Sequence, residues 1–212
     1  MSSISTSSEL MLAEKGCGHL THHAAPRVLI GGLGLGFSLK RVLEMIGSRG
    51  VVRVAELIPE VVEWNRELLA AVNGDLLKKR NVEMLVGDVF SVIRSATVSP
   101  FDAILLDVDN GPTSFVQHGN KRLYSRRGLQ AIRNALAPGG RVAFWSAEAE
   151  PAFRETLKRA GFYVEEFPAK AHERAKRFAH MIYVGERTSA PSFTYSAVSN
   201  RSPSAKHSGH RR

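Results

Sequence analysis

Cysteine is almost absent from this sequence, which has one, Cys17, among 212 residues. A single cysteine excludes an internal disulfide and most cysteine-based metal sites, and no metal is expected. Long apolar runs are absent too, since no stretch approaches the roughly 20 residues that a membrane-spanning helix needs. The first residues, MSSISTSSELM, lack the basic segment and apolar core of a secretory signal. These absences predict a soluble cytoplasmic protein without a membrane partner.

Positive charge is in excess, with 29 Lys and Arg against 20 Asp and Glu and a formal net charge of +9. Five of these cations and none of the acids lie in residues 187–212, so the excess over the rest of the chain falls to +4. This segment is rich in Ser, Pro and Gly and has little to bury, which is typical of a disordered tail. We therefore expect no nucleic-acid partner, with an RNA- or DNA-contacting tail left open as the alternative.

Segments typical of strands alternate with segments typical of helices along most of the chain. Alternation of this kind predicts a parallel sheet with helices on both faces. The last two strands are separated by about ten residues, too few for a crossover helix, so they should form an antiparallel pair. The predicted fold is α/β, a Rossmann-like doubly wound sheet of seven strands, mostly parallel with an antiparallel C-terminal edge hairpin. The expected strands are residues 27–32, 51–56, 82–86, 101–106, 141–145, 162–167 and 178–185.

The same pattern divides the chain into three parts. Residues 1–26 show no sustained periodicity, and we interpret them as a flexible lead-in. Residues 27–186 form one domain of ordinary size, with a globular balance of 43% hydrophobic and 23% charged residues over the whole chain. Residues 187–212 are the basic tail. The sequence leaves the oligomeric state open, with a homodimer as one alternative.

A glycine-rich loop follows the first expected strand and predicts a cofactor site. In sheets of this kind ligands bind beyond the carboxyl ends of the strands, and glycines let the backbone approach them closely. The spacing places Gly32, Gly34 and Gly36 at alternate positions, whereas a dinucleotide-binding loop would require glycine at Phe37. We infer a cofactor without a pyrophosphate, of which S-adenosylmethionine is the usual example.

Acidic residues at the next two strand ends support this cofactor. Glu56 ends the second strand, where a carboxylate can accept hydrogen bonds from both ribose hydroxyls. Asp88, followed by Val89, ends the third strand, where it could meet the adenine amino group or act only as a helix N-cap. Together with the glycine loop, these residues predict an adenosine-type sulfonium cofactor.

Five segments in order carry a likeness to a known family: VLIGGLGLGF, VVRVAELIPEVVEWNRELL, VGDVF, FDAILLDVDNGP and NKRLYSRRGLQAIRNALAPGGRVAFWSA. They resemble the spermidine synthase-like (aminopropyltransferase) branch of the class I S-adenosylmethionine-dependent methyltransferase superfamily. The resemblance covers about residues 27–184, and the N-terminal β-domain of that family is reduced here to 26 residues. It implies a cytoplasmic enzyme of polyamine biosynthesis that takes decarboxylated S-adenosylmethionine as co-substrate.

The resemblance also implies site residues. Asp107 corresponds to the first aspartate of the D-x-x-D-P loop, which is the proposed general base and also adjoins the cofactor. The loop is one residue longer here, so the second, substrate-binding aspartate is either Asp109 or absent. Tyr124 lies in the Leu-Tyr-Ser stretch that opens the following helix and would contact the substrate. Such a site would help a protonated amine to lose a proton before it attacks the carbon beside the sulfonium.

Two other functions remain open. A methyltransferase acting on a small molecule or a protein needs the same cofactor but less acid–base help. A catalytically inactive relative would keep the fold for binding alone. The cluster of basic residues at Lys121, Arg122, Arg126 and Arg127 favours an anionic substrate over a polycationic one.

Overall fold

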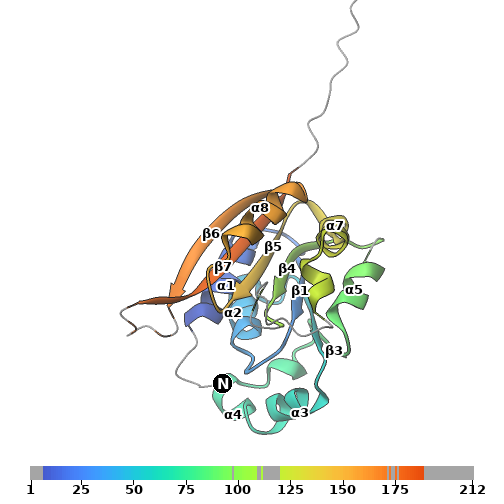
Figure 1. Cartoon of the computed structure of the whole chain (residues 1–212). Coiled ribbons are helices and arrows are strands. Elements are labelled where there is room, and N and C mark those ends of the chain that lie inside the picture. The colour runs from blue at the N-terminus through green and yellow to red at the C-terminus, as the bar shows by residue number, and fades with distance from the viewer. Residues whose placement is uncertain are drawn as a thin grey trace, which may run out of the picture.

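Seven strands form one sheet in the computed structural model, which describes residues 7–96, 98–108, 111, 120–170, 172, 175 and 177–188. Their order across the sheet is β3-β2-β1-β4-β5-β7-β6 (Figure 1). The strands are β1 Arg27–Gly31, β2 Val51–Glu56, β3 Val82–Val86, β4 Phe101–Leu106, β5 Leu136–Ser146, β6 Phe162–Lys170 and β7 Phe178–Arg187.

The direction of the strands confirms the predicted sheet. Strands β3, β2, β1, β4 and β5 pair in parallel, whereas β7 is antiparallel to both β5 and β6. The order reverses between β1 and β4, because the chain runs outward from β1 to β3 and then returns to the other side of β1. This reversal opens a crevice at the carboxyl ends of β1 and β4, where ligands bind in sheets of this type.

Helices cover both faces of the sheet (Figure 1). On one face Leu12 of α1 and Val42 of α2 share a buried core with Leu105 of β4. On the other face α5, α7 and α8 cover the sheet, and Ile132 of α7 and Phe153 of α8 belong to the same buried core as Ile104 of β4. In the described part of the chain the helices are α1 Ser7–Cys17, α2 Phe37–Ile46, α3 Pro59–Glu67, α4 Ala70–Asn73, α5 Val89–Ser95, α6 Lys121–Tyr124, α7 Arg126–Ala135 and α8 Pro151–Arg159, with 3₁₀ turns η1 Gly18–Leu20 and η2 Leu76–Lys78. None of these helices is both long enough and apolar enough to cross a bilayer.

The N-terminal segment differs from the predicted flexible lead-in. Residues 7–20 are helical, and Leu12, Ala13 and Cys17 are fully buried against the sheet. A Cβ atom on Gly16 would collide with the side chain of Leu105, so the helix and β4 are in very close contact here. The prediction failed because the apolar residues of α1 are consecutive rather than spaced at 3–4 residues, so no helical stripe is visible.

Strand β5 is longer than the sequence suggests. The expected strand began at residue 141, whereas α7 ends at Ala135 and Leu136 already pairs with Phe101 of β4. The register then shifts, and regular pairing resumes between Arg141 and Ala103. The Pro-Gly-Gly segment in between is an irregular stretch of strand.

Candidate cofactor site

A hollow of about 210 Å³ lies at the carboxyl ends of β1 to β4, where the strand order reverses. Five of the predicted site residues come together in its wall, while Gly34, Gly36 and Tyr124 do not line it. Its lining residues are Gly32, Ala55, Glu56, Leu57, Ile58, Val61, Gly87, Asp88, Val89, Asp107, Val108 and Asn120. A larger hollow of about 630 Å³ includes Arg49, Lys79 and Arg80 but no carboxylate, so it lacks the acid that would accept from both ribose hydroxyls.

The glycine loop passes very close to the end of β4. Gly32 has a φ of +87°, and a Cβ atom there would collide with the main-chain carbonyl oxygen of Asp107. Two backbone hydrogen bonds fix this approach, from Gly32 N to the Ala55 carbonyl and from Asp107 N to the Gly31 carbonyl, both at 2.9 Å. Only glycine fits at position 32, because it tolerates both the positive φ and the close contact.

Two asparagines hold the loop from the side of α3 and α4. The Asn65 amide nitrogen donates to the Gly34 carbonyl at 2.9 Å, and that of Asn73 donates to the Leu35 carbonyl at 2.6 Å. Both side chains are buried. We did not predict these residues from the sequence, although buried asparagine in a helix is unfavourable by itself and so is a sign of a specific contact. They fix the loop without touching the hollow.

Glu56 is buried at the end of β2, and its carboxylate holds two loops together. One oxygen accepts from Leu33 N at 2.8 Å and the other from Ile58 N at 3.0 Å. A carboxylate has about four acceptor positions, so each oxygen keeps capacity for another donor. The geometry therefore leaves room for the predicted contact with ribose hydroxyls.

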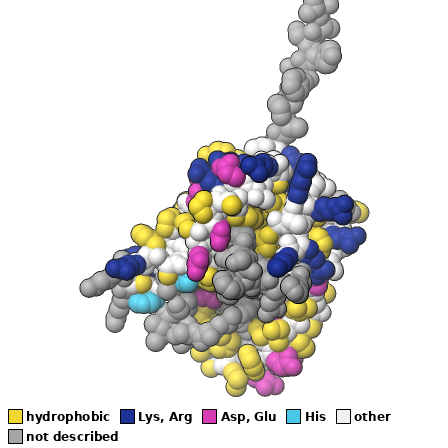
Figure 2. All heavy atoms as spheres, in the orientation of Figure 1, with side chains coloured by type: hydrophobic (Ala, Val, Ile, Leu, Met, Phe, Trp, Pro, Cys, Tyr) yellow, Lys and Arg dark blue, Asp and Glu magenta, His cyan; other side chains and the backbone are white. Residues whose placement is uncertain are grey.

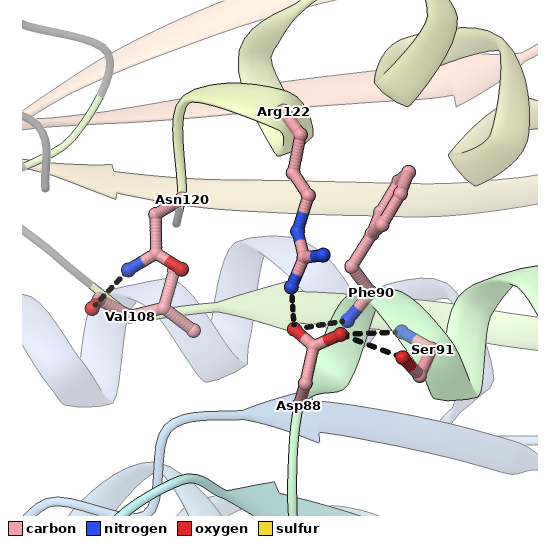
Figure 3. Close-up of polar contacts among 6 residues, drawn as sticks. All are labelled: Asp88, Phe90, Ser91, Val108, Asn120 and Arg122. Carbon is pink, nitrogen blue, oxygen red and sulfur yellow. Dashed lines mark hydrogen bonds and ion pairs between the residues drawn. The ribbon is translucent and has the colours of Figure 1, made fainter. Parts of the chain in front are cut away.

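Asp88 caps α5 and is also ion-paired (Figure 3). One oxygen accepts from Phe90 N at 3.2 Å and lies 2.7 Å from an Arg122 guanidinium nitrogen. The other accepts from Ser91 N at 3.0 Å and from the Ser91 hydroxyl at 2.7 Å. Burial, the largest single influence, raises the pKa of Asp88, but the hydrogen bonds from Ser91 and Phe90 and the charge of Arg122 outweigh it, so the pKa lies below its ordinary value.

These contacts use all four acceptor positions of Asp88. The helix cap, one of the two roles considered from the sequence, is present in the structure. For Asp88 to accept a hydrogen bond from an adenine amino group as well, a present donor has to leave. Arg122 is the donor that can leave most easily, because its side chain is half exposed and belongs to a different helix.

Asp107 lies at the end of β4, and no hydrogen bond from any described residue reaches its carboxylate. Burial, and secondly the charge of Glu56, raise the pKa of Asp107 to about 6. Glu9 lies in the first turn of α1. Burial, and secondly the charge of Asp107, raise the pKa of Glu9 to about 7. We did not identify Glu9 from the sequence, because its proximity to Asp107 depends on how α1 packs.

Other predicted positions lie outside the hollow. The ring of Tyr124 packs against Phe144 and Phe153, with centroids 5.9 and 5.7 Å away. Asp109 lies outside the described residues. Asn120, which the sequence analysis did not single out, lines the hollow and donates to the Val108 carbonyl at 3.2 Å. Among the described residues, no group of three or more His, Cys, Asp or Glu side chains is placed to hold a metal ion.

Comparison with solved structures identifies the fold. No family model and no curated protein sequence matches the chain. A spermidine synthase in complex with the transition-state analogue AdoDATO is 19% identical, with a TM-score of 0.67 over 84% of this chain and 60% of that one. Spermidine synthase from Thermotoga maritima is 16% identical, with a TM-score of 0.61 over 84% and 59%. The chain thus spans about three-fifths of the length of these two enzymes.

A methyltransferase is similar to nearly the same degree. Human methyltransferase-like protein 13, in complex with SAH, is 17% identical, with a TM-score of 0.64 over 87% of this chain and 81% of that one. At such identities the likeness shows the fold and not the reaction. The chain has the Rossmann-like methyltransferase fold that is common to spermidine synthases and methyltransferases.

Proposed function

We propose that this protein is a spermidine synthase-like transferase, which binds decarboxylated S-adenosylmethionine in the hollow and transfers its aminopropyl group to an amine. The observation that carries the proposal is Asp107, whose carboxyl has a pKa of about 6 and lies in the same wall as Glu56 and Asp88. A group with this pKa is mostly ionised at neutral pH and is still basic enough to take a proton.

The cofactor would lie across the ends of β1, β2 and β3. Glu56 would accept from the ribose hydroxyls, and Gly32 would line the hollow beside Asp107. Asp88 and Val89 would face the adenine, once Arg122 gives up its place on the Asp88 carboxylate. Gly34 and Gly36 would act through the shape of the loop, which Asn65 and Asn73 hold. The fold-level neighbours that were solved with AdoDATO and with SAH support a ligand of this type.

The reaction needs one proton transfer and one substitution. The acceptor's ammonium group gives a proton to Asp107, and the neutral amine then attacks the carbon beside the sulfonium. A carbon–nitrogen bond forms, the carbon–sulfur bond breaks, and its electron pair neutralises the sulfur to leave a thioether. The product leaves as a secondary ammonium ion, and Asp107 passes its proton to water before the next turnover. Asp109 and Tyr124 remain proposed contacts on the acceptor side.

The domain division that we propose changes at its N-terminal end. The cofactor domain of residues 27–186 would be extended by α1, because this helix is packed against β4 and β5. Residues 187–212 remain proposed as a basic tail.

An assay of product identity tests the function. The protein is offered decarboxylated or ordinary S-adenosylmethionine, each with putrescine or spermidine, and new polyamine is sought by mass spectrometry. We expect a product one aminopropyl group heavier, with the decarboxylated co-substrate only, and a loss of at least 100-fold in Asp107→Asn, as for other general bases. Full activity of Asp107→Asn would contradict the role of the base. Absence of any polyamine product would exclude aminopropyl transfer to these amines.

Methyl transfer is the second candidate. The share of each neighbour's length that this chain matches favours it, since the match covers 81% of human methyltransferase-like protein 13 but about 60% of the spermidine synthases. In that case the same hollow would bind S-adenosylmethionine, and SAH would bind more tightly than methylthioadenosine. The reverse preference would favour aminopropyl transfer.

A further inference from the structure

A second hollow, of about 460 Å³, lies between α5, α6 and α7 and is rich in arginine. It adjoins the candidate cofactor site, because Asp88 lines one hollow and its ion-pair partner Arg122 lines the other. Figure 2 shows Lys and Arg side chains gathered over this region, at the right of the view. The lining residues are Phe90, Arg94, Arg122, Ser125, Arg127, Gly128 and Ala131.

The charge of this region has one sign. Residues 111–147 contain six Lys and Arg and no Asp or Glu, and residues 89–101 contain one Arg and no acid. We use the name arginine groove for the second hollow with the basic residues around it, which are Arg94, Lys121, Arg122, Arg126 and Arg127. Within the described residues, only Arg122 of this set is in an ion pair. The groove therefore carries several cations that the protein itself does not neutralise.

Two of these cations lie where they lower the stability of the protein when no partner is bound. Arg126 and Arg127 are in the first turn of α7, and no acid is present there. A cation near the positive end of a helix costs about 0.3–1 kcal/mol, and neighbouring like charges add to this cost. An anionic partner would remove both costs.

We propose that the arginine groove binds the phosphate backbone of a single-stranded nucleic acid. The cations extend over three helices, which suits a chain of phosphates better than one small anion. Guanidinium groups bind phosphate oxygens in pairs and also stack on flat rings. Arg122 already lies over the ring of Phe90, 5.1 Å from its centroid, and both line the hollow. An unpaired base could stack in this place, which a base inside a duplex could not do.

The groove and the cofactor site would influence each other through Arg122. A phosphate that takes the Arg122 guanidinium frees one acceptor position on Asp88, which the adenine amino group can then use. Nucleic acid and cofactor should therefore increase each other's affinity by the same factor. This coupling rests on the proposed function, whereas binding of nucleic acid to the groove does not.

Fluorescence anisotropy with a labelled 12-nucleotide single-stranded RNA of mixed sequence tests the groove, on the full chain between 50 and 200 mM salt. We expect the logarithm of the affinity to fall with the logarithm of salt concentration with a slope of about −3.5, for about five neutralised phosphates. The double variant Arg94→Gln/Arg127→Gln should bind at least 10-fold more weakly at 50 mM salt and with a slope shallower by about 1.4.

The matched control is Lys79→Gln/Arg80→Gln, which removes the same charge from the other basic hollow. Both double variants keep residues 187–212, so any contribution of that segment is equal in the two. Equal weakening in both would overturn the assignment to the groove, as would no binding to wild type at 50 mM salt. Equally tight binding of a polyglutamate of similar length would show that the groove takes an acidic peptide instead.

A titration with SAH and with methylthioadenosine, with and without the RNA, tests the coupling. RNA should raise the affinity for whichever of the two binds, and Arg122→Gln should abolish this effect. RNA binding without any such increase would overturn the coupling. If neither adenosine ligand binds, the proposed function fails while the RNA titration stands by itself.

Discussion

At the scale of single residues, the site depends on carboxyl groups whose surroundings differ. Glu56 is held by backbone amides, Asp88 is fully engaged as a cap and ion pair, and Asp107 has no described hydrogen-bond donor. Asp107 has the lower pKa of the pair that it forms with Glu9, so it ionises first and its charge then keeps the proton on Glu9. Two acidic residues, Asp107 and Glu9, thus differ in their degree of ionisation at the same pH.

Asp107 should reduce the stability of the protein above pH 4. The pKa of this acid is higher in the folded than in the unfolded chain, so the folded state binds the proton more tightly. The free energy of unfolding should therefore fall as pH rises from about 4 to about 6 and then level off with respect to this group. Glu9 should act in the same sense between about pH 4.5 and 7.

The variant Asp107→Asn removes this effect. At pH 8 its free energy of unfolding should exceed that of wild type by a value on the order of 2–3 kcal/mol, and at pH 4 the two should be nearly equal. Urea unfolding at the two pH values measures the difference. Asp75→Asn, at an exposed position on the surface, is the control and should change little at either pH. A gain for Asp107→Asn that is the same at pH 4 and pH 8 would contradict the assigned pKa.

Arg122 should weaken cofactor binding in the absence of nucleic acid, because it occupies Asp88. Arg122→Gln should therefore raise the affinity for SAH or methylthioadenosine by about 2- to 5-fold, since an exposed ion pair is worth up to about 1 kcal/mol. Isothermal titration calorimetry measures the change. Arg66→Gln breaks a similar exposed pair, with Glu63 on α3, and should have no effect. A lower affinity of Arg122→Gln would show that Arg122 itself holds the ligand.

At the scale of elements, helix α1 differs most from what the sequence predicted. It covers β4 and β5 from residues before the first strand, and its first turn carries Glu9, whose pKa is raised in part by the charge of Asp107. Its close packing depends on Gly16, which has no room for a side chain. The helix is therefore part of the domain and not a lead-in.

Gly16→Ala should destabilise the protein by about 1–3 kcal/mol, because the added methyl group displaces the buried side chain of Leu105. Gly18→Ala is the matched control, since nothing lies within 4 Å of the position of its Cβ atom. Its effect should stay within about 0.5 kcal/mol. Urea unfolding of the two variants compares them. Equal stability of Gly16→Ala and Gly18→Ala would mean that α1 is not packed on β4 in solution.

Prediction from sequence was most accurate where an apolar segment is followed by a residue that ends regular structure. The bounds of β2, β3 and β4 were predicted to the residue, because each is a short run rich in apolar residues and those of β3 and β4 stop at Gly87 and Asp107. Strand β5 was predicted too short, since Pro and Gly normally end an element and here lie in an irregular strand. The roles of Asn65 and Asn73 could not be predicted, because their partners are carbonyls of a loop more than 30 residues away.

At the scale of the whole molecule, two hollows with different charge lie side by side. The candidate cofactor site has three carboxylates in its wall, whereas the adjoining arginine groove has none. The Asp88–Arg122 pair connects them across 34 positions of sequence. The sequence showed the basic cluster but not that Arg94, from another helix, adds to it. A surface of this kind results from packing α5 against α7.

The sequence by itself determined the α/β architecture, the glycine loop and the strand-end acids, because local periodicity and the direction of the strands are sufficient for these. Only the tertiary structure decided how α1 packs, which donors occupy Asp88, and that the charge of Asp107 raises the pKa of Glu9. These features depend on distances between side chains far apart in the chain. Such distances follow from the packing of helices on the sheet, which no local pattern encodes.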